Sequence, residues 1–302
     1  MLMPEGTFYR DQALECISRC ITVDLFIAVN TKLQSLDIAT MAPIAGITGG
    51  DLFLYPDFDC MQHSEKLYYQ IFRILTRVSV SDVMLKLRVS SGLTVTEYFG
   101  QFGTYAQSEF GLASLDQDKV FSATVRCDQA LAADTPVFAQ CATLYTDAMG
   151  ERKIRILNYT WKVASNLYNY CRSADVESVS QFKLRHDLTH VTKLGAKGTK
   201  EKVINDLVEM LTNYRNTCAN QTNPSQLVLP ETLTFLPLYI LSSLKLPALK
   251  LLNQCFLDTK VAQVHNLLSM SMEQMSYELY PHIYKVTDIG LSEHYGHVDD
   301  AT

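Results

Sequence analysis

Two basic residues on one predicted strand offer the simplest recognition chemistry in the chain. Lys86 and Arg88 alternate with apolar residues over positions 83–89, and this period of two is typical of a half-buried strand. Residues two apart on a strand point to the same face, about 7 Å from each other. That spacing suits two cations that bind an acidic peptide, because an arginine can hold a carboxylate through two hydrogen bonds. The alternative is a solvated sheet face with outward Lys and Arg, and it stays open.

A second basic pair lies on the strand predicted at 152–156. Lys153 and Arg155 share one face of this strand with Glu151. The ordinary interpretation is a cross-strand ladder of ion pairs that adds little stability. The functional interpretation is added positive potential toward acidic peptides or anionic lipid. The candidate binding residues are therefore Lys86, Arg88, Lys153 and Arg155.

Two histidines four positions apart suggest a zinc-dependent hydrolase as an alternative. His186 and His190 would lie one turn apart on a helix, which is the chelating spacing of HExxH metalloproteases. The position of the general-base glutamate holds Asp187, and no pattern for a third ligand follows. GxSxG, P-loop and GxGxxG motifs are missing from the sequence. We therefore predict neither a metal site nor catalytic residues, and keep the hydrolase as the enzyme alternative.

Three regions of different pattern must position these residues. Residues 1–80 alternate strand and helix, as in the last part of a doubly wound α/β sheet. Residues 81–167 hold short alternating strands between polar turns, which predicts an antiparallel β-sandwich. Residues 168–285 are predicted to be helical, and residues 286–302 to form a polar tail. The predicted fold class is α+β and multidomain.

Several local features can be predicted within this frame. A nearly continuous apolar run at 22–29 predicts a fully buried strand, and a second strand is predicted at 51–55. A helix is expected between them, around 33–45. Ser64 is predicted to cap the next helix. Trp161, the single tryptophan, is expected to pack where the sandwich meets the helical region.

Composition excludes several classes of protein. Hydrophobic residues make up 47% of the chain and charged residues 19%, as in globular proteins. The net charge of −6 argues against a general nucleic-acid-binding protein. No stretch of about 20 uncharged apolar residues occurs, so we expect no membrane span. Eight scattered cysteines without a CxxC pair predict reduced, mostly buried thiols in the cytosol.

Several short strings carry a resemblance to a known family. The strings VMLKLRVSSGL at 83–93, YFGQF at 98–102 and LYT at 144–146 with GERKIR at 150–155 resemble the β-sandwich of the COPII cargo-adaptor family, Sec24. Further strings are similar to that family's trunk, helical domain and gelsolin-like junction and occur in the family's order, at 8–16, 23–26, 173–176, 237–245 and 280–284.

The resemblance implies a fold and a function. The fold would be the remnant of a von Willebrand-like trunk, an antiparallel β-sandwich and an all-α helical domain. The function would be that of a non-enzymatic COPII component, peripheral on the cytosolic face of the endoplasmic reticulum, which selects cargo for transport to the Golgi. Its partners would be a Sec23-like coat subunit, cytosolic cargo tails, an anionic membrane surface and, indirectly, a Sar-type small GTPase. Lys86 and Arg88 would belong to a pocket for acidic sorting signals, with Lys86 at a place where many relatives carry arginine.

The sequence also departs from the family pattern. The family's zinc ribbon would lie N-terminal to this segment, so we expect no cofactor here. Most of the trunk is missing, and residues 286–302 are either a tail or the start of the gelsolin-like domain, which suggests a piece of a longer or diverged product. The related GTPase-activating subunit of the same coat is a second alternative, although no arginine can be assigned to that role.

Overall fold

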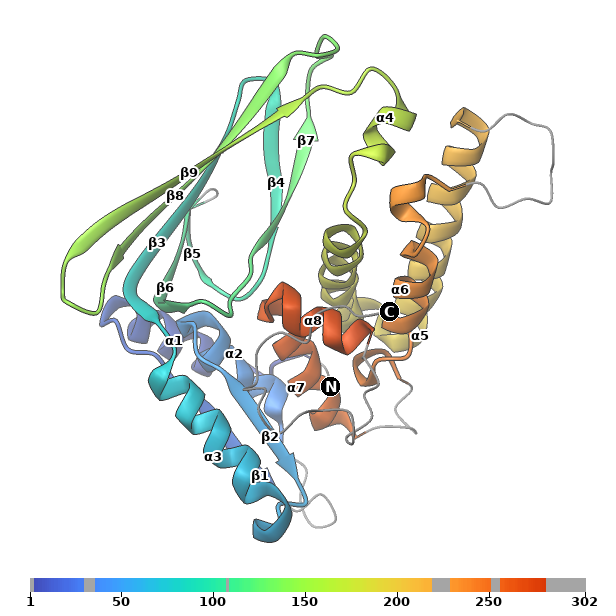
Figure 1. Cartoon of the computed structure of the whole chain (residues 1–302). Helices are drawn as coiled ribbons and strands as arrows, with labels where there is room; N and C mark the ends of the chain where they lie inside the picture. Colours follow the sequence, from blue (N-terminus) through green and yellow to red (C-terminus); the bar gives the residue numbers. More distant parts are fainter. Residues whose placement is uncertain (1–2, 30–35, 107–108, 219–228, 251–255, 281–302) are drawn as a thin grey trace, which may run out of the picture.

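The computed structural model describes residues 3–29, 36–106, 109–218, 229–250 and 256–280. Three groups of elements follow one another along the chain (Figure 1). The first is α/β, the second is antiparallel β and the third is helical, so the predicted fold class is confirmed. The tail predicted at 286–302 lies outside the described residues.

The first group contains one parallel pair of strands. Its elements are α1 (Phe8–Ser18), β1 (Leu25–Val29), α2 (Ile38–Thr48), β2 (Leu52–Pro56) and α3 (Cys60–Thr76). β1 and β2 pair in parallel, and α2 provides the crossover that parallel strands require. The prediction of a fully buried first strand is wrong, because within β1 only Val29 is buried.

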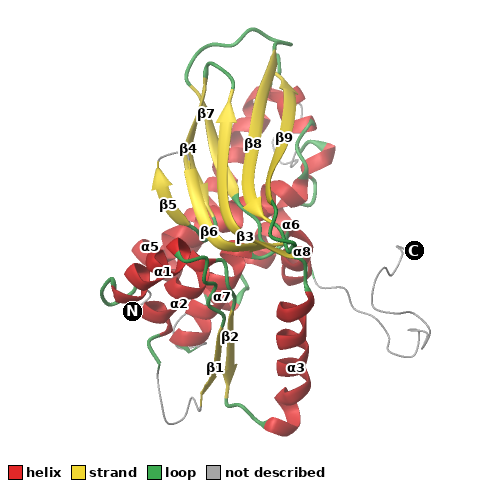
Figure 2. Cartoon of the chain, turned by 90° about the vertical axis from the view of Figure 1, so that its left-hand side faces the viewer, coloured by secondary structure: helices red, strands yellow, loops and turns green. Residues whose placement is uncertain are grey.

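The helix α3 begins earlier than predicted and has little cover. Its cap is Asp59, whose carboxylate accepts a hydrogen bond from the Met61 backbone N–H at 2.9 Å. Ser64 therefore lies inside the helix, and its prediction as the cap is wrong. No residue of α3 is buried, and the helix extends alongside β2 away from the sandwich (Figures 1 and 2).

The second group is the predicted sandwich. Its strands are β3 (Ser79–Val89), β4 (Leu93–Phe99), β5 (Gly103–Ala106), β6 (Glu109–Asp116), β7 (Ser122–Cys127), β8 (Pro136–Thr146) and β9 (Arg152–Lys162). One antiparallel sheet has the order β5-β6-β3-β8-β9, and β4 pairs with β7 in a second sheet (Figure 2). Val83, Phe99, Phe110 and Leu112 are buried in this group.

The last strand of the large sheet differs from its prediction. β9 extends to Lys162 instead of ending at 156, and every one of its residues is exposed. Trp161 is 52% exposed on this strand. The expectation that Trp161 packs between sandwich and helices is therefore wrong, because a strand at the edge of a sheet has a neighbour on one side alone.

The third group is helical. Its elements are α4 (Leu167–Arg172), α5 (Val176–Cys218), η1 (Glu231–Leu233), α6 (Leu236–Ser243), η2 (Pro247–Leu249), α7 (Leu257–Ser269) and α8 (Met272–Leu279). α5 is interrupted at Gly195, whose φ of 69° and ψ of 172° are not helical. Its first half packs with η2, α7 and α8 around Leu188, Leu249 and Leu267. No helix in the described parts is long and apolar enough to cross a bilayer.

The three groups share contacts rather than forming separate bodies. Val261 and Ala262 of α7 are buried with Ile38 and Leu52 of the first group. Gly49 ends α2 at a positive φ of 88°, which favours glycine. A Cβ atom on Gly49 would collide with the backbone oxygen of Ser114 on β6. The first group is therefore in direct contact with both others.

The cysteines are less buried than predicted. The seven that the structure describes are free thiols, and none of the seven is buried. Cys20, Cys60 and Cys127 are exposed. The prediction of mostly buried thiols is wrong for this part of the chain, because the cysteines lie on element surfaces and at strand ends.

Candidate functional site

Lys86 and Arg88 lie on one face of β3, but their surroundings differ. Lys86 forms an ion pair with Glu109 on the neighbouring strand β6. Arg88 is exposed, and its guanidinium donates a hydrogen bond to Gln140 Oε1 at 3.3 Å. Within the described residues, no acidic side chain lies within ion-pair distance of Arg88. Arg88 is therefore the cation that could receive an anionic ligand, while Glu109 already compensates the charge of Lys86.

Exposed apolar side chains lie on the same face of the sheet as Arg88. The register places Arg88 opposite Gln140, and Gln140 opposite Asn158, so a polar row crosses three strands. The Gln140 amide donates to Asn158 Oδ1 at 3.0 Å. Exposed apolar side chains follow on the next rows of this face: Met84, Ile154 and Ile156. We call Arg88, Met84, Ile154 and Ile156 together the outer surface.

Lys153 and Arg155 lie on the other face of the same sheet. Arg155 is opposite Thr143, and Thr143 is opposite Leu85, which alternates with Lys86 along β3. Lys153 pairs with Asp147 and, at 2.9 Å, with Glu151; its hydrogen bonds to these two carboxylates raise its pKa. Arg155 is exposed, with no acidic side chain within ion-pair distance among the described residues. The four candidate residues therefore form two separate pairs, each with one uncompensated arginine.

The histidine pair lies at the contact between the sandwich and α5. The rings of His186 and His190 are 4.8 Å apart between centroids. The His186 ring also packs against Phe99 of β4 at 5.5 Å and Phe182 at 6.3 Å. In the described chain, no group of three His, Cys, Asp or Glu side chains could hold a metal ion. The hydrolase alternative has no support, since the two rings pack in an aromatic cluster.

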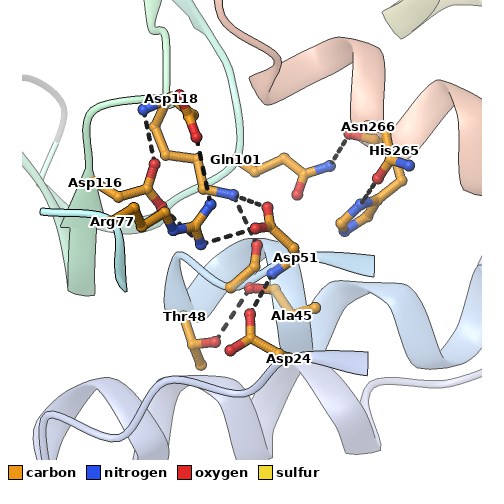
Figure 3. A network of polar contacts seen from close by, with 12 residues as sticks. Asp24, Ala45, Thr48, Asp51, Arg77, Gln101, Asp116, Asp118, His265 and Asn266 are labelled. Carbon is orange, nitrogen blue, oxygen red and sulfur yellow. Dashed lines mark hydrogen bonds and ion pairs between the residues drawn. The ribbon is translucent and has the colours of Figure 1, made fainter. Parts of the chain in front are cut away.

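A buried charge network joins the first and second groups of elements (Figure 3). Arg77, which follows α3 directly, contacts Asp51 at 2.7 Å and Asp116 at 3.0 Å. Lys119 also pairs with Asp51 and donates to the backbone oxygen of Gly50 at 3.0 Å. Burial opposes ionisation of Asp51, but the charges of Lys119 and Arg77 outweigh it and lower the pKa of that carboxyl. For Asp116, burial dominates and raises the pKa.

His265 lies beside this network and links α7 to the other two groups. Its Nε2 is 3.0 Å from the backbone oxygen of Ala42 in α2. Its own backbone oxygen accepts a hydrogen bond from the Gln101 amide at 2.6 Å (Figure 3). Burial lowers the pKa of His265 to about 4, so the ring is neutral at pH 7 and donates from Nε2 to Ala42.

Sequence patterns do not reveal this junction. Arg77, Asp51 and Asp116 are far apart in the chain, and each alone is an ordinary surface residue type. The sole local signal is the acidic run Asp116 to Asp118 beside Lys119 after a buried strand. The cations and carboxylates of the junction pair with one another, so the junction holds the elements together and, among the described residues, has no group left for catalysis.

Family models match the chain in three consecutive parts. The Sec23/Sec24 trunk domain matches residues 1–75, the Sec23/Sec24 beta-sandwich domain matches residues 80–164, and the Sec23/Sec24 helical domain matches residues 175–277. The order agrees with the three groups of elements in the structure.

Individual relatives point in the same direction. Protein transport protein SEC24 B from Arabidopsis thaliana is 31% identical over 97% of this chain and 26% of its own length. Protein transport protein Sec24C from Homo sapiens is 26% identical over 95% of this chain, again 26% of its own length. The crystal structure of the human COPII-coat protein Sec24c matches with a TM-score of 0.85 and 26% identity, over 92% of this chain and 36% of that one. The chain spans about a quarter of the length of these curated relatives. With trunk, β-sandwich and helical domains in this order, the chain belongs to the Sec23/Sec24 family, and the relatives it resembles are Sec24 proteins.

Proposed function

We propose that this chain is a non-enzymatic, cargo-selecting part of a COPII vesicle coat that works in transport from the endoplasmic reticulum to the Golgi. The observation that carries the proposal is the similarity to Sec24 proteins over 97% of the chain, through all three domains. The relatives are Sec24 proteins, and nothing favours the GTPase-activating alternative.

The proposed ligand is the acidic cytosolic tail of a cargo protein, and the proposed site is the outer surface. Arg88 offers an exposed guanidinium without an acidic partner among the described residues. Met84, Ile154 and Ile156 offer exposed apolar area on the same face of the sheet. A guanidinium and apolar side chains on one face suit an extended signal that combines a carboxylate with an apolar side chain. Single contacts of this kind are weak, and a polymerising coat would add avidity.

The proposed setting follows from the family. The chain would lie on the cytosolic face of the endoplasmic reticulum, against an anionic membrane surface. It would pair with a Sec23-like coat subunit and meet a Sar-type small GTPase indirectly. No cofactor is proposed for this segment, and no nucleic acid is proposed as a partner.

A binding experiment with single variants tests the site. The affinity of a fluorescent acidic tail peptide is measured for the wild type and for Arg88→Ala, and we expect about tenfold weaker binding after loss of a charged hydrogen-bond donor. Removing the compensated pair together, with Lys86→Met and Glu109→Gln, should change the affinity less than about twofold. The matched control is Arg126→Ala, an exposed arginine on β7 that already pairs with Asp128 at 2.7 Å.

The outcomes separate the possibilities. A loss of peptide affinity in Arg88→Ala alone supports the outer surface as the site. Equal affinities of wild type, Arg88→Ala and Arg126→Ala would remove the outer surface from the proposal. Salt-insensitive binding would contradict an acidic ligand altogether, because screening weakens exposed charge contacts.

A further inference from the structure

In the described part of the chain, β9 is an open edge of the large sheet along its entire length. It is the last strand in the order β5-β6-β3-β8-β9, and among the described strands it pairs with β8 alone. All eleven of its residues are exposed, from Arg152 to Lys162. Proteins normally shorten, twist or cover such an edge, because unpaired N–H and C=O groups accept another strand.

The hydrogen bonds at both ends of β9 show which backbone groups are free. At one end, the Asp147 N–H donates to the oxygen of Glu151 at 3.0 Å, and at the other, the Val163 N–H donates to the oxygen of Thr135 at 3.0 Å. Both pairs continue the β8–β9 register, and in antiparallel pairs bonded and non-bonded positions alternate. Odd-numbered residues of β9 therefore bond to β8. The N–H and C=O groups of the even-numbered residues point out of the sheet edge, from Ile154 through Thr160.

Apolar side chains are exposed on both faces of this edge. On the outer face, Ile154 is 66% exposed and Ile156 is 53% exposed. On the opposite face, Tyr159 and Trp161 stack with their ring centroids 6.2 Å apart and 13° between their planes. An added strand would bury part of both rows, because its side chains alternate between the same two faces.

The charge of β9 selects among possible partners. The strand carries four cations and no acidic residue: Arg152, Lys153, Arg155 and Lys162. Arg152 and Lys153 have acidic partners, whereas Arg155 and Lys162 have none within ion-pair distance among the described residues. Pairing β9 with a second β9 would place cations against cations, which disfavours self-association. An acidic strand would be attracted instead.

We infer that the free edge of β9 accepts an extended, acidic segment of a cargo tail as an additional strand of the sheet. The inference rests on the proposed function for the source of the peptide and adds the mode of binding. In an antiparallel arrangement, a residue opposite Arg155 would occupy a non-hydrogen-bonded pair, where side chains come closest. A carboxylate there would meet the guanidinium, and apolar residues would lie opposite Leu157, Tyr159 and Trp161.

A synthetic peptide with this pattern tests the inference on the unaltered 302-residue chain. The peptide has glutamates at the positions opposite Arg155 and Lys153 and apolar residues at the positions opposite Leu157, Tyr159 and Trp161. Two forms carry N-methyl groups on alternate amides, so that each form blocks one edge of the peptide strand. Strand addition predicts that one form binds at least about tenfold more weakly, while the other keeps its affinity, since only one set of amides bonds to β9. Docking through side chains alone predicts that both forms bind alike.

Trp161 provides a local readout, because it is the single tryptophan of the chain and lies on β9. Peptide binding should shift its emission to shorter wavelength and reduce its quenching by acrylamide. Asn158→Pro removes one outward N–H without touching the bonds to β8 and should weaken binding about tenfold. Asn158→Ala keeps that N–H and is the matched control. Circular dichroism checks that Asn158→Pro is folded.

Each outcome decides between the two proposals. Unequal effects of the two methylated forms, together with the change in Trp161 emission, support strand addition. Equal affinities of the two forms overturn strand addition. If the peptide then still depends on Arg88, cargo binding at the outer surface stands. If acidic peptides do not bind the chain at all, the proposed site and strand addition both fall.

Discussion

Arg88 and Arg155 lie in one sheet and point to opposite sides of it. Arg88 shares its row with Gln140 and Asn158, whereas Arg155 shares its row with Thr143 and Leu85. In an antiparallel sheet, directly opposed residues share a face and successive residues alternate. These two arginines have no acidic partner among the described residues, and they therefore create two positive surfaces with the sheet between them.

This separation predicts additive effects on peptide binding. Since no single carboxylate can contact both guanidinium groups, the losses in Arg88→Ala and Arg155→Ala should multiply in the double variant. The coupling free energy of the double-mutant cycle should stay below about 0.5 kcal/mol. A coupling of about 1 kcal/mol or more would show that both arginines contact the same part of one ligand.

Arg77 is predicted to be essential for stability, unlike its neighbour Arg73. The Arg77 side chain is 9% exposed and contacts Asp51 and Asp116. Arg77→Ala leaves these carboxylates buried without their partner, so we expect a loss of about 3–5 kcal/mol in the free energy of unfolding. Arg73→Ala is the matched control, because Arg73 binds Asp118 but is 53% exposed. Arg73→Ala should lower the free energy of unfolding by about 1 kcal/mol or less.

Denaturant unfolding of both variants measures the difference. A similar, small loss in the two variants would mean that water reaches the carboxylates around Arg77. The ion pairs of Arg77 would then contribute little to the association of the first and second groups of elements.

Arg185 is also a buried arginine, but we predict that replacing it stabilises the protein, whereas replacing Arg77 destabilises it. Its side chain is fully buried on α5, and burial lowers its pKa to about 10. It donates to the backbone oxygen of Met270 at 2.7 Å, while its Nε has no hydrogen-bond partner among the described residues. Arg185→Met removes a buried charge that has no acidic partner there and fills a similar volume. We expect the free energy of unfolding to rise by about 1 kcal/mol or more.

The comparison with Arg77→Met makes the test specific. The same chemical change at Arg77 should destabilise the protein, because two carboxylates lose their partner there. If Arg185→Met is also strongly destabilised, the hydrogen bond to Met270 outweighs the cost of burying the charge.

The local patterns of the sequence predict the elements well where each strand or helix has its own signal. The alternation around Lys86 predicts β3, and it also predicts correctly that Lys86 and Arg88 share a face. These features depend on neighbours in the chain, which the sequence displays directly.

Features that depend on residues distant in the chain could not be predicted. The compensation of Lys86 by Glu109 requires the register between β3 and β6. The opposite orientation of Arg155 requires the register through β8. The exposure of Trp161 requires knowing that β9 is an edge. Burial and pairing decide which cations are available for a ligand, and both come from the assembled sheet.

His265 is predicted to make the protein acid-sensitive. In the unfolded chain a histidine has a pKa of about 6.5, whereas burial lowers the pKa of His265 to about 4. Between these values the unfolded state binds one more proton than the folded state at this site. The stability that neutral His265 contributes to the folded state is therefore complete above pH 6.5. It is lost as the pH falls toward 4, at about 1.4 kcal/mol per pH unit.

The variant His265→Gln isolates this effect. A glutamine does not titrate, so the difference in unfolding free energy between pH 6.5 and pH 5 should be smaller than in the wild type by about 2 kcal/mol. The side chains of Lys119 and Asp51, whose charges also act on His265, are unchanged in the variant. Identical slopes in His265→Gln and the wild type would show that the imidazole is hydrated, and that α7 contacts α2 more loosely than the 3.0 Å contact with Ala42 indicates.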